Sequence, residues 1–306
     1  MLGLAPRLRR AVPILLEGVF GTGDSGEIEA AIVTLPLEIV RCFHFEVSVG
    51  AVLGLELADG SRIALKVHQP QVPAARLDAQ QAVQAHIAER GFPCPRPTLG
   101  PTPVGLGLAT GEEWRAEGRR YAAVTPARRR SMAEALVRLI QLARETGPTT
   151  ALETPRPPDG LWPEPHNALF DFERSRRGAE EIDEIGRRAR ERMFAGPRVV
   201  AHRDWSIKHF RFRAGGDITV VYDWDSLFRD YESVALGAAA ATHTAAIHAR
   251  VLRPTVEDAL AFAADYEGAR GGLDANMRRA GLAAAVYAVA YTARCEHALV
   301  ASGTRR

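Results

Sequence analysis

The chain has 306 residues, of which 46% are hydrophobic and 25% charged, and its 39 basic and 37 acidic side chains leave a formal net charge of +2. This composition is typical of a globular protein, and the length predicts two lobes with a cleft between them. A near-neutral total argues against a dedicated nucleic-acid binder, which needs a concentrated basic surface. Three widely spaced cysteines form neither a disulfide framework nor a metal knuckle, and the most apolar stretch carries charges. We therefore expect a cytoplasmic protein without a membrane or nucleic-acid partner.

Lysine is unusually rare in this chain. It occurs only at Lys66 and Lys208, so 37 of the 39 basic residues are arginine. Arginine replaces lysine at most solvated positions, whereas a compact point charge against a phosphate oxygen favours lysine. Chance is the alternative explanation for two residues. The hypothesis is that both lysines contact phosphate.

The first strand-like runs are residues 52–57 and 62–67, and the Asp-Gly turn between them predicts an antiparallel hairpin. Lys66 then lies near the end of the second strand. Ser48 and Gly50 lie at the mouth of the pair.

A helix is predicted over residues 76–90, and a segment rich in Gly, Pro and Thr, residues 98–118, is typical of a hinge. We therefore expect two lobes: residues 1–110, with a small sheet and one helix, and residues 111–306, which are mostly helical. A Gly-x-Gly-x-x-Gly segment at 21–26 is expected to be a surface loop.

The second lobe is predicted to be mostly helical. Residues 128–146 have helical apolar spacing, and residues 173–193 read as a charged, amphipathic surface helix. A Pro-rich loop, 147–171, separates them. Short β runs return within 198–224, and the remainder, 230–302, reads as Ala-rich helices.

Reactive side chains concentrate in residues 201–212 and 220–227. Asp223 follows Asp204 by 19 residues, which is enough for a loop, a hairpin and a return, so a strand over 218–222 would place the two carboxylates side by side. Two aspartates with a lysine nearby suit phosphoryl transfer. One aspartate aligns the attacking hydroxyl, the other holds a divalent metal, and lysines neutralise phosphate charge.

The pattern H-x-D, followed after a strand by D-W-D, resembles the aminoglycoside phosphotransferase family within the kinase-like fold, over about residues 40–300. The resemblance implies an α+β, bilobal protein-kinase-like fold. Its small β-rich N-lobe, residues 1–110, would hold the nucleotide-binding sheet. Its larger, mainly helical C-lobe, residues 111–306, would hold the catalytic loop and the acceptor-binding helices. The resemblance also implies that Asp204 is catalytic, that Asp223 is the principal metal ligand and that His202 braces the loop. Lys66 is similar to the lysine that this fold places on its third strand against the α/β-phosphates. Ser48 and Gly50, at the mouth of the same strand pair, would then contact the nucleotide together with Lys66.

The resemblance further implies an ATP-dependent O-phosphotransferase that uses ATP (or GTP) and Mg²⁺. Its acceptor would be a small molecule, either an aminoglycoside-like antibiotic or another hydroxylated metabolite. Lys208, four residues after Asp204, lies within reach of a transferred phosphoryl group. The candidates for acceptor binding, each with a packing or helix-dipole role as the alternative, are Trp162, His166, Asp230 and Glu232.

His209 stands where the family pattern H-x-D-x-x-x-x-N has asparagine. Imidazole is a poorer partner than an amide oxygen for magnesium. Three readings remain open: His209 binds the metal through a neutral nitrogen, it contacts substrate or phosphate, or only Asp223 and Asp225 hold metal.

Two further departures concern the nucleotide side. Helix 76–90 should offer a glutamate to Lys66 but presents Gln80 and Gln81, which could orient the lysine without neutralising it. No Gly-rich loop lies just upstream of Lys66. These departures keep open a nucleotide-binding pseudokinase without turnover. Transfer of a nucleotidyl group is a third hypothesis, without positive support in the sequence.

Overall fold

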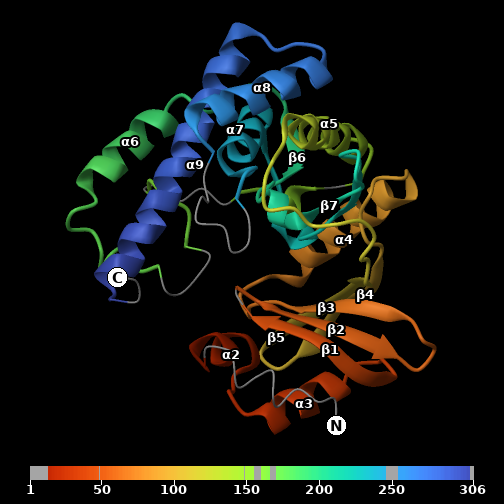
Figure 1. Ribbon diagram of the computed structural model, residues 1–306. Helices are drawn as coiled ribbons and strands as arrows, with labels where there is room; N and C mark the ends of the chain where they lie inside the picture. The colour runs from red at the N-terminus through yellow and green to blue at the C-terminus, as the bar shows by residue number, and fades with distance from the viewer. Residues whose placement is uncertain are drawn as a thin grey trace. The chain divides into compact units, whose positions relative to one another are not determined.

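The chain is an α+β protein with an antiparallel sheet in its first part and mainly helices in its second, as expected (Figure 1). It divides into two compact units, Met1–Ala116 and Glu117–Arg306. The division falls after the residue 110 boundary expected from composition, because the last strand of the sheet continues to Glu113. The computed structural model describes residues 13–47, 49–147, 149–154, 160–165, 170–245 and 254–303.

The first unit is built on a five-stranded sheet in the order β1-β2-β3-β5-β4, with every neighbouring pair antiparallel. The predicted hairpin is confirmed as β2–β3, and Gly60 supplies the positive φ of +81° that its turn requires. The pairing sets Lys66 opposite Val52 on one side and Thr110 on the other. The strands are β1 (Ile39–Val47), β2 (Ala51–Leu57), β3 (Arg62–Val67), β4 (Pro97–Val104) and β5 (Gly107–Glu113).

The prediction of a hinge over residues 98–118 is wrong, because β4 and β5 occupy most of it. Prolines are tolerated in β4 because it is an edge strand, where a missing N–H leaves no interior ladder bond unmade. Gly105 turns the chain between the two strands with φ +56°. A segment whose composition is typical of a linker thus forms the β4 edge of the sheet.

The first unit also has more helices than the one expected. α2 (Pro13–Phe20) and α3 (Ser25–Val33) precede the sheet, and their buried side chains join its apolar core. α4 (Ala74–Glu89) contacts β4 and matches the predicted helix. Residues 21–26 are not wholly a loop, because α3 begins there. The carboxylate of Asp24 caps it by accepting hydrogen bonds from two backbone N–H groups of the first turn.

The second unit contains five α-helices within the described ranges. Close crossing of α7 and α9 depends on Gly237, where a Cβ would stand 2.5 Å from the backbone nitrogen of Ala285. The predicted helix over 173–193 is shorter, because turns and the positive φ of Gly178 precede it. No helix in these ranges is long and apolar enough to cross a bilayer. The five helices of the second unit are α5 (Pro126–Ala143), α6 (Glu180–Arg190), α7 (Glu232–Thr242), α8 (Val256–Arg270) and α9 (Ala275–Ala301).

Four short strands form a nested insert in this unit. β6 (Arg198–His202) pairs with β9 (Leu227–Tyr231), and between them β7 (Phe210–Phe212) pairs with β8 (Ile218–Val221). The runs around three of these strands were predicted. β9 was missed, because it adjoins the helical region. Because the inner hairpin returns the chain to β9, the loop after β6 and the turn after β8 meet.

Candidate functional site

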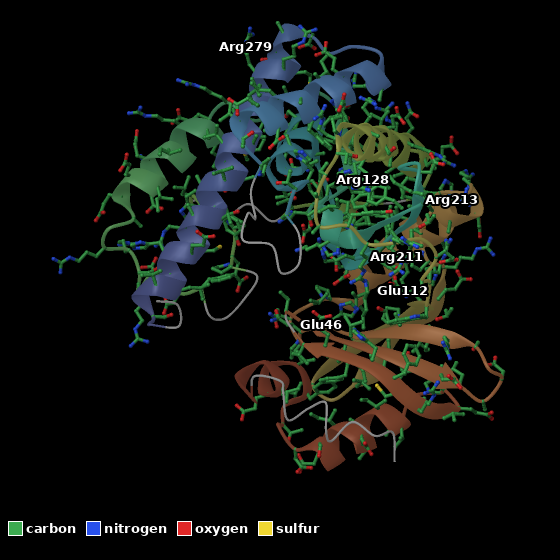
Figure 2. The ribbon with its side chains drawn as sticks, viewed as in Figure 1. Glu46, Glu112, Arg128, Arg211, Arg213 and Arg279 are labelled. Carbon is green, nitrogen blue, oxygen red and sulfur yellow. The ribbon has the colours of Figure 1, made fainter. Side chains whose placement is uncertain are left out.

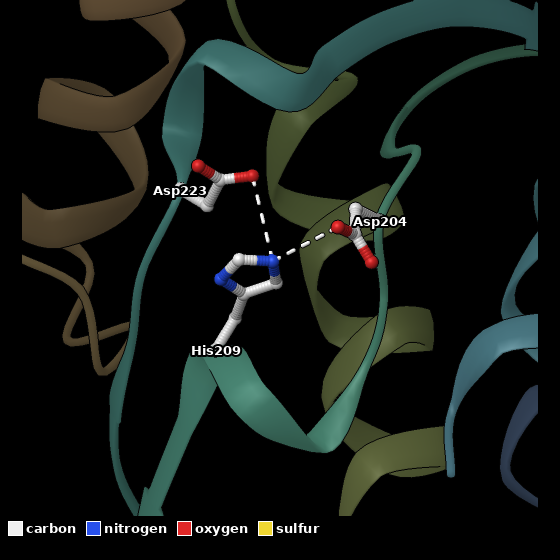
Figure 3. A group of neighbouring side chains, drawn as sticks. All are labelled: Asp204, His209 and Asp223. Carbon is white, nitrogen blue, oxygen red and sulfur yellow. Dashed lines mark hydrogen bonds and ion pairs between the residues drawn. The ribbon is translucent and has the colours of Figure 1, made fainter. Parts of the chain in front are cut away.

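Asp204 from the loop after β6 and Asp223 from the turn after β8 meet around His209, as Figure 3 shows. One potential ligand atom from each of these side chains lies within 4.8 Å of the others. His209 Nε2 is 3.0 Å from Asp204 Oδ2 and 3.6 Å from Asp223 Oδ2. The two carboxylates are about one-third exposed, so they are accessible to a ligand.

The Asp204 carboxylate is held by three donors. The Ser206 hydroxyl donates to Oδ1 at 2.6 Å, and Lys208 Nζ lies 2.6 Å from Oδ2, beside His209. Burial acts to raise the pKa of Asp204, but hydrogen bonds and positive charge from His209 and Lys208 outweigh it and hold this pKa far below its usual range. A carboxylate held so strongly ionised is a weak base. Its chemistry is to orient a donor and to stabilise charge.

Asp223 is the one non-glycine residue with positive φ in the described parts of the chain, at φ 72° and ψ 44°. Aspartate tolerates this left-handed conformation better than most residues, and such strain concentrates at functional sites. The Ser226 hydroxyl donates to Asp223 Oδ2 at 2.6 Å, and the Ser226 N–H donates to the Asp223 carbonyl. Local turn chemistry therefore fixes the carboxylate on the His209 side.

His202, the last residue of β6, links the segment that carries Asp204 to the segment that carries Asp223. Its ring is fully buried, and burial lowers the pKa of His202, so the imidazole is neutral. Nε2 lies 3.1 Å from the Tyr222 carbonyl, which can only accept, so Nε2 carries the proton. Trp205 anchors the loop to α5 by donating from Nε1 to the Met132 carbonyl at 2.9 Å. Sequence reasoning did not assign Trp205, Ser206 or Ser226.

In the first unit, Lys66 has a partner that the sequence analysis missed. Its Nζ lies 3.6 Å from Glu112 Oε1 on β5; Glu112 is buried, and the Lys66 side chain is largely shielded from solvent. A carboxylate therefore neutralises this lysine, which the glutamines of the helix could not do. Gln81 instead donates from Nε2 to the Leu99 carbonyl at 2.8 Å, and Gln80 is buried on α4.

The mouth of the β1–β2 turn contains Gly50, where a Cβ would stand 2.6 Å from the Val67 carbonyl oxygen. No side chain fits there, so the backbone of this turn lies directly against the end of β3. Ser48, the other residue expected at this position, lies outside the described residues.

Of the four predicted acceptor residues, the structure describes Trp162, Asp230 and Glu232, and none of these three belongs to the Asp204 group. Glu232 is buried, accepts a 2.7 Å hydrogen bond from the Tyr266 hydroxyl and pairs with Arg270, and Asp230 is also buried. Burial of these two carboxylates corrects the expectation that they attract a cationic acceptor from solvent. His166 lies outside the described residues. Asp225, proposed as a metal ligand, is exposed and is not a member of the group in Figure 3.

Trp162 packs between helices. Its Nε1 donates to Asp183 Oδ1 at 2.7 Å, and its ring centroid lies 5.1 Å from that of Tyr287 on α9. On α6, a Cβ at Gly186 would stand 2.2 Å from the Trp162 ring. Of the two roles that the sequence left open for Trp162, these contacts favour the packing anchor.

Gly186→Ala is therefore expected to destabilise the protein by about 1–3 kcal/mol through overpacking. Alanine normally stabilises a helix interior relative to glycine by about 0.5–1 kcal/mol. Gly268→Ala on α8 is the matched control, because no atom lies within 4 Å of a Cβ built there. Urea unfolding measures both variants. Equal stability of the two would contradict the packing role of Trp162.

Stability is expected to fall as the pH drops below about 6.5, the ordinary pKa of histidine. Burial lowers the pKa values of His202 and His243, so both rings stay neutral in the folded protein while the unfolded chain takes up protons. Each histidine then contributes up to about 1.4 kcal/mol per pH unit below that value. Urea unfolding between pH 8 and pH 5 measures the slope. His243→Phe, which keeps a ring against Phe262, should flatten it, and an unchanged slope would exclude His243.

The comparisons with known proteins identify the family and the fold. The model described as "Phosphotransferase enzyme family" matches residues 55–272. No curated protein sequence matches the chain. The solved structure of amicoumacin kinase hAmiN in complex with AMP-PNP, Ca²⁺ and Ami is similar, with a TM-score of 0.57 and 13% identity over 92% of this chain and 97% of that chain.

Two further structures share the fold. Macrolide 2'-phosphotransferase type I has a TM-score of 0.56 and 16% identity over 92% of this chain and 97% of that chain. The microcompartment-associated aminopropanol kinase has a TM-score of 0.57 and 13% identity over 89% and 94%. The family match covers well over half of the chain and includes the H-x-D and D-W-D motifs. The chain therefore belongs to the phosphotransferase enzyme family, as its resemblance to the aminoglycoside phosphotransferases implied.

Proposed function

We propose that this phosphotransferase is ATP-dependent and transfers the γ-phosphoryl group to a hydroxyl of an aminoglycoside-like antibiotic or another hydroxylated metabolite. The observation that carries the proposal is the meeting of Asp204, His209 and Asp223, with the Lys208 ammonium bound to the same carboxylate as His209. This arrangement offers an orienting carboxylate, a cation and a metal-ligand set within one group.

In the proposed reaction Asp204 accepts a hydrogen bond from the acceptor hydroxyl. The hydroxyl oxygen forms a bond to the γ-phosphorus while the bond to the bridging oxygen of ADP breaks, and the hydroxyl proton leaves along the Asp204 hydrogen bond. The strongly lowered pKa of Asp204 fits a transfer in which the hydroxyl proton leaves late. In a loose transition state the hydroxyl keeps its proton until late, so orientation contributes more than basicity.

The residues present suit a divalent cation. Carboxylate oxygens are ligands for Mg²⁺, and imidazole binds metals such as Mn²⁺ more readily than Mg²⁺. We assign the metal to Asp223 and His209. In that state Nε2 would no longer carry the proton that it donates to Asp204 here, and the ring would keep its proton on Nδ1. When bound, the metal would neutralise phosphate charge.

Lys208 supplies a second positive charge. Its ammonium forms an ion pair with Asp204, and the side chain is about one-third exposed. An ammonium has three protons, so another of them can be donated to a γ-phosphate oxygen. We assign Lys66 to the α/β-phosphates, with its charge balanced by Glu112 when no nucleotide is bound. Both lysines of this arginine-rich chain would then contact phosphate groups of the nucleotide.

The test is release of ADP or GDP from ATP or GTP, with Mg²⁺ or Mn²⁺, in the presence of aminoglycosides, macrolides and amino alcohols. Mass spectrometry of the acceptor identifies the group transferred. A phosphoryl group on an acceptor hydroxyl is the expected product, and a nucleotidyl group would overturn the reaction class. Metal-dependent thermal stabilisation by ATP without turnover on the whole panel would instead favour the nucleotide-binding pseudokinase, for which His209 is the motivating departure.

A further inference from the structure

Lys66 and Glu112 are placed together by the register of the sheet. In the β3–β5 pairing Lys66 lies opposite Thr110, and Ala64 lies opposite Glu112. Residues two apart on a strand share a face, so Lys66 and Glu112 are diagonal neighbours on one face of the sheet. Figure 2 labels Glu112 on this sheet, and the ion-pair distance is 3.6 Å. The backbone pairing alone therefore brings the two charges within reach.

Both ends of the pair are largely shielded from solvent, with side chains 11% exposed for Lys66 and 8% for Glu112. A buried carboxylate is costly unless its oxygens are satisfied. Oε1 faces Lys66, and Oε2 accepts a 2.8 Å hydrogen bond from Gln84 Nε2 on α4. Gln84 is itself fixed, because the same amide group donates to the Pro95 carbonyl at 3.0 Å. The carboxylate therefore has a defined orientation as well as a charge.

In protein kinases, phosphoryl transfer requires the strand lysine to be held by an acidic partner, which those enzymes carry on a helix. In this chain α4 contributes an amide, and the acid stands on the neighbouring strand. We propose that Glu112 is the positioning residue that holds Lys66 for the nucleotide phosphates, and that Gln84 orients the Glu112 carboxylate. This inference rests on the proposed function. If so, the β3–β5 pairing itself positions the acid beside Lys66, and no acid from α4 is needed.

The scarcity of lysine makes a direct test practicable. In protein labelled with ¹³C at the lysine ε-carbon, the two residues Lys66 and Lys208 give two signals, which Lys208→Arg assigns. In Glu112→Gln we expect the Lys66 signal to titrate at lower pH, because the negative charge favouring the ammonium is gone. We also expect kcat/KM for ATP to fall about 10- to 100-fold, as when the partner of an orienting pair is removed, while KM for the acceptor stays unchanged.

Glu113→Gln is the matched control, since it makes the same change one residue later on the opposite face of β5. Glu113 Oε2 accepts from the Arg96 N–H. Glu113 lies opposite Ile63 in the β3–β5 pairing, on the face of the sheet away from Lys66. It should leave the Lys66 signal and kcat/KM for ATP as in the wild type. Glu112→Asp keeps the charge and shortens its reach, so it should give a smaller loss of the same kind.

The outcomes separate the inference from the function it rests on. If AMP-PNP with Mg²⁺ shifts the Lys66 signal in the wild type, but Glu112→Gln leaves both the titration and kcat/KM for ATP unchanged, the positioning role of Glu112 is wrong and the proposed function stands. If wild-type protein shows neither turnover nor a nucleotide-induced Lys66 shift, the proposed function fails. Should Glu112→Gln not fold, unchanged ATP kinetics in Glu112→Asp would overturn the inference.

Discussion

Asp204→Asn is expected to lower kcat by about 10²- to 10⁴-fold, the range associated with a positioned acid–base group. The amide keeps the size of the carboxylate and an oxygen for the Ser206 hydroxyl. It loses the negative charge that binds Lys208 and His209, so neither side chain is held beside the acceptor hydroxyl. Nucleotide affinity should remain within a few-fold of the wild type, because the nucleotide phosphates are assigned to other residues.

The measurement is single-turnover phosphate transfer alongside the binding of a fluorescent ATP analogue. Asp217→Asn is the matched control, because Asp217 is exposed in the β7–β8 turn of the same insert and accepts from the Arg213 N–H through its backbone carbonyl. It should keep full activity. Full activity in Asp204→Asn itself would remove Asp204 from the mechanism, whatever the geometry of its neighbours.

The meeting of Asp204 and Asp223 could be predicted because it follows from topology. A strand ending just before Asp223, returned by a hairpin after Asp204, must bring the two segments together, and β7–β8 does this. The β2–β3 hairpin with Lys66 near its end was predictable for a similar reason, since an Asp-Gly turn sets the register locally. Local signals therefore located the reactive side chains.

The partner of Lys66 could not be predicted in this way. Glu112 lies 46 positions after Lys66, in a segment whose Gly, Pro and Thr content hides two strands. Its role depends on the β3–β5 register, which no local pattern specifies. The burial of Glu232 is likewise a tertiary property, because it requires Tyr266 and Arg270 from α8. Long-range pairing, rather than residue type, separates the predicted residues from the missed ones.

Asp223→Asn is expected to weaken divalent-metal binding and to lower kcat/KM by at least about 100-fold, since even residues that only support a metal ligand contribute about 10- to 100-fold. The amide can still accept from the Ser226 hydroxyl, so the left-handed turn should be kept. What is lost is the negative charge facing His209 Nε2. Calorimetric titration with Mg²⁺ and Mn²⁺ in the presence of AMP-PNP measures the metal affinity directly.

Asp225→Asn is the discriminating comparison, because the sequence motif offers both aspartates as ligands while the structure brings only Asp223 into the group with His209. Asp225 is exposed, two residues further along the turn. If metal binding depends on the convergence of side chains, Asp225→Asn should change the affinity much less than Asp223→Asn. Equal losses in the two variants would mean that the metal is held across the whole D-W-D motif, with His209 left to contact the acceptor or the phosphate.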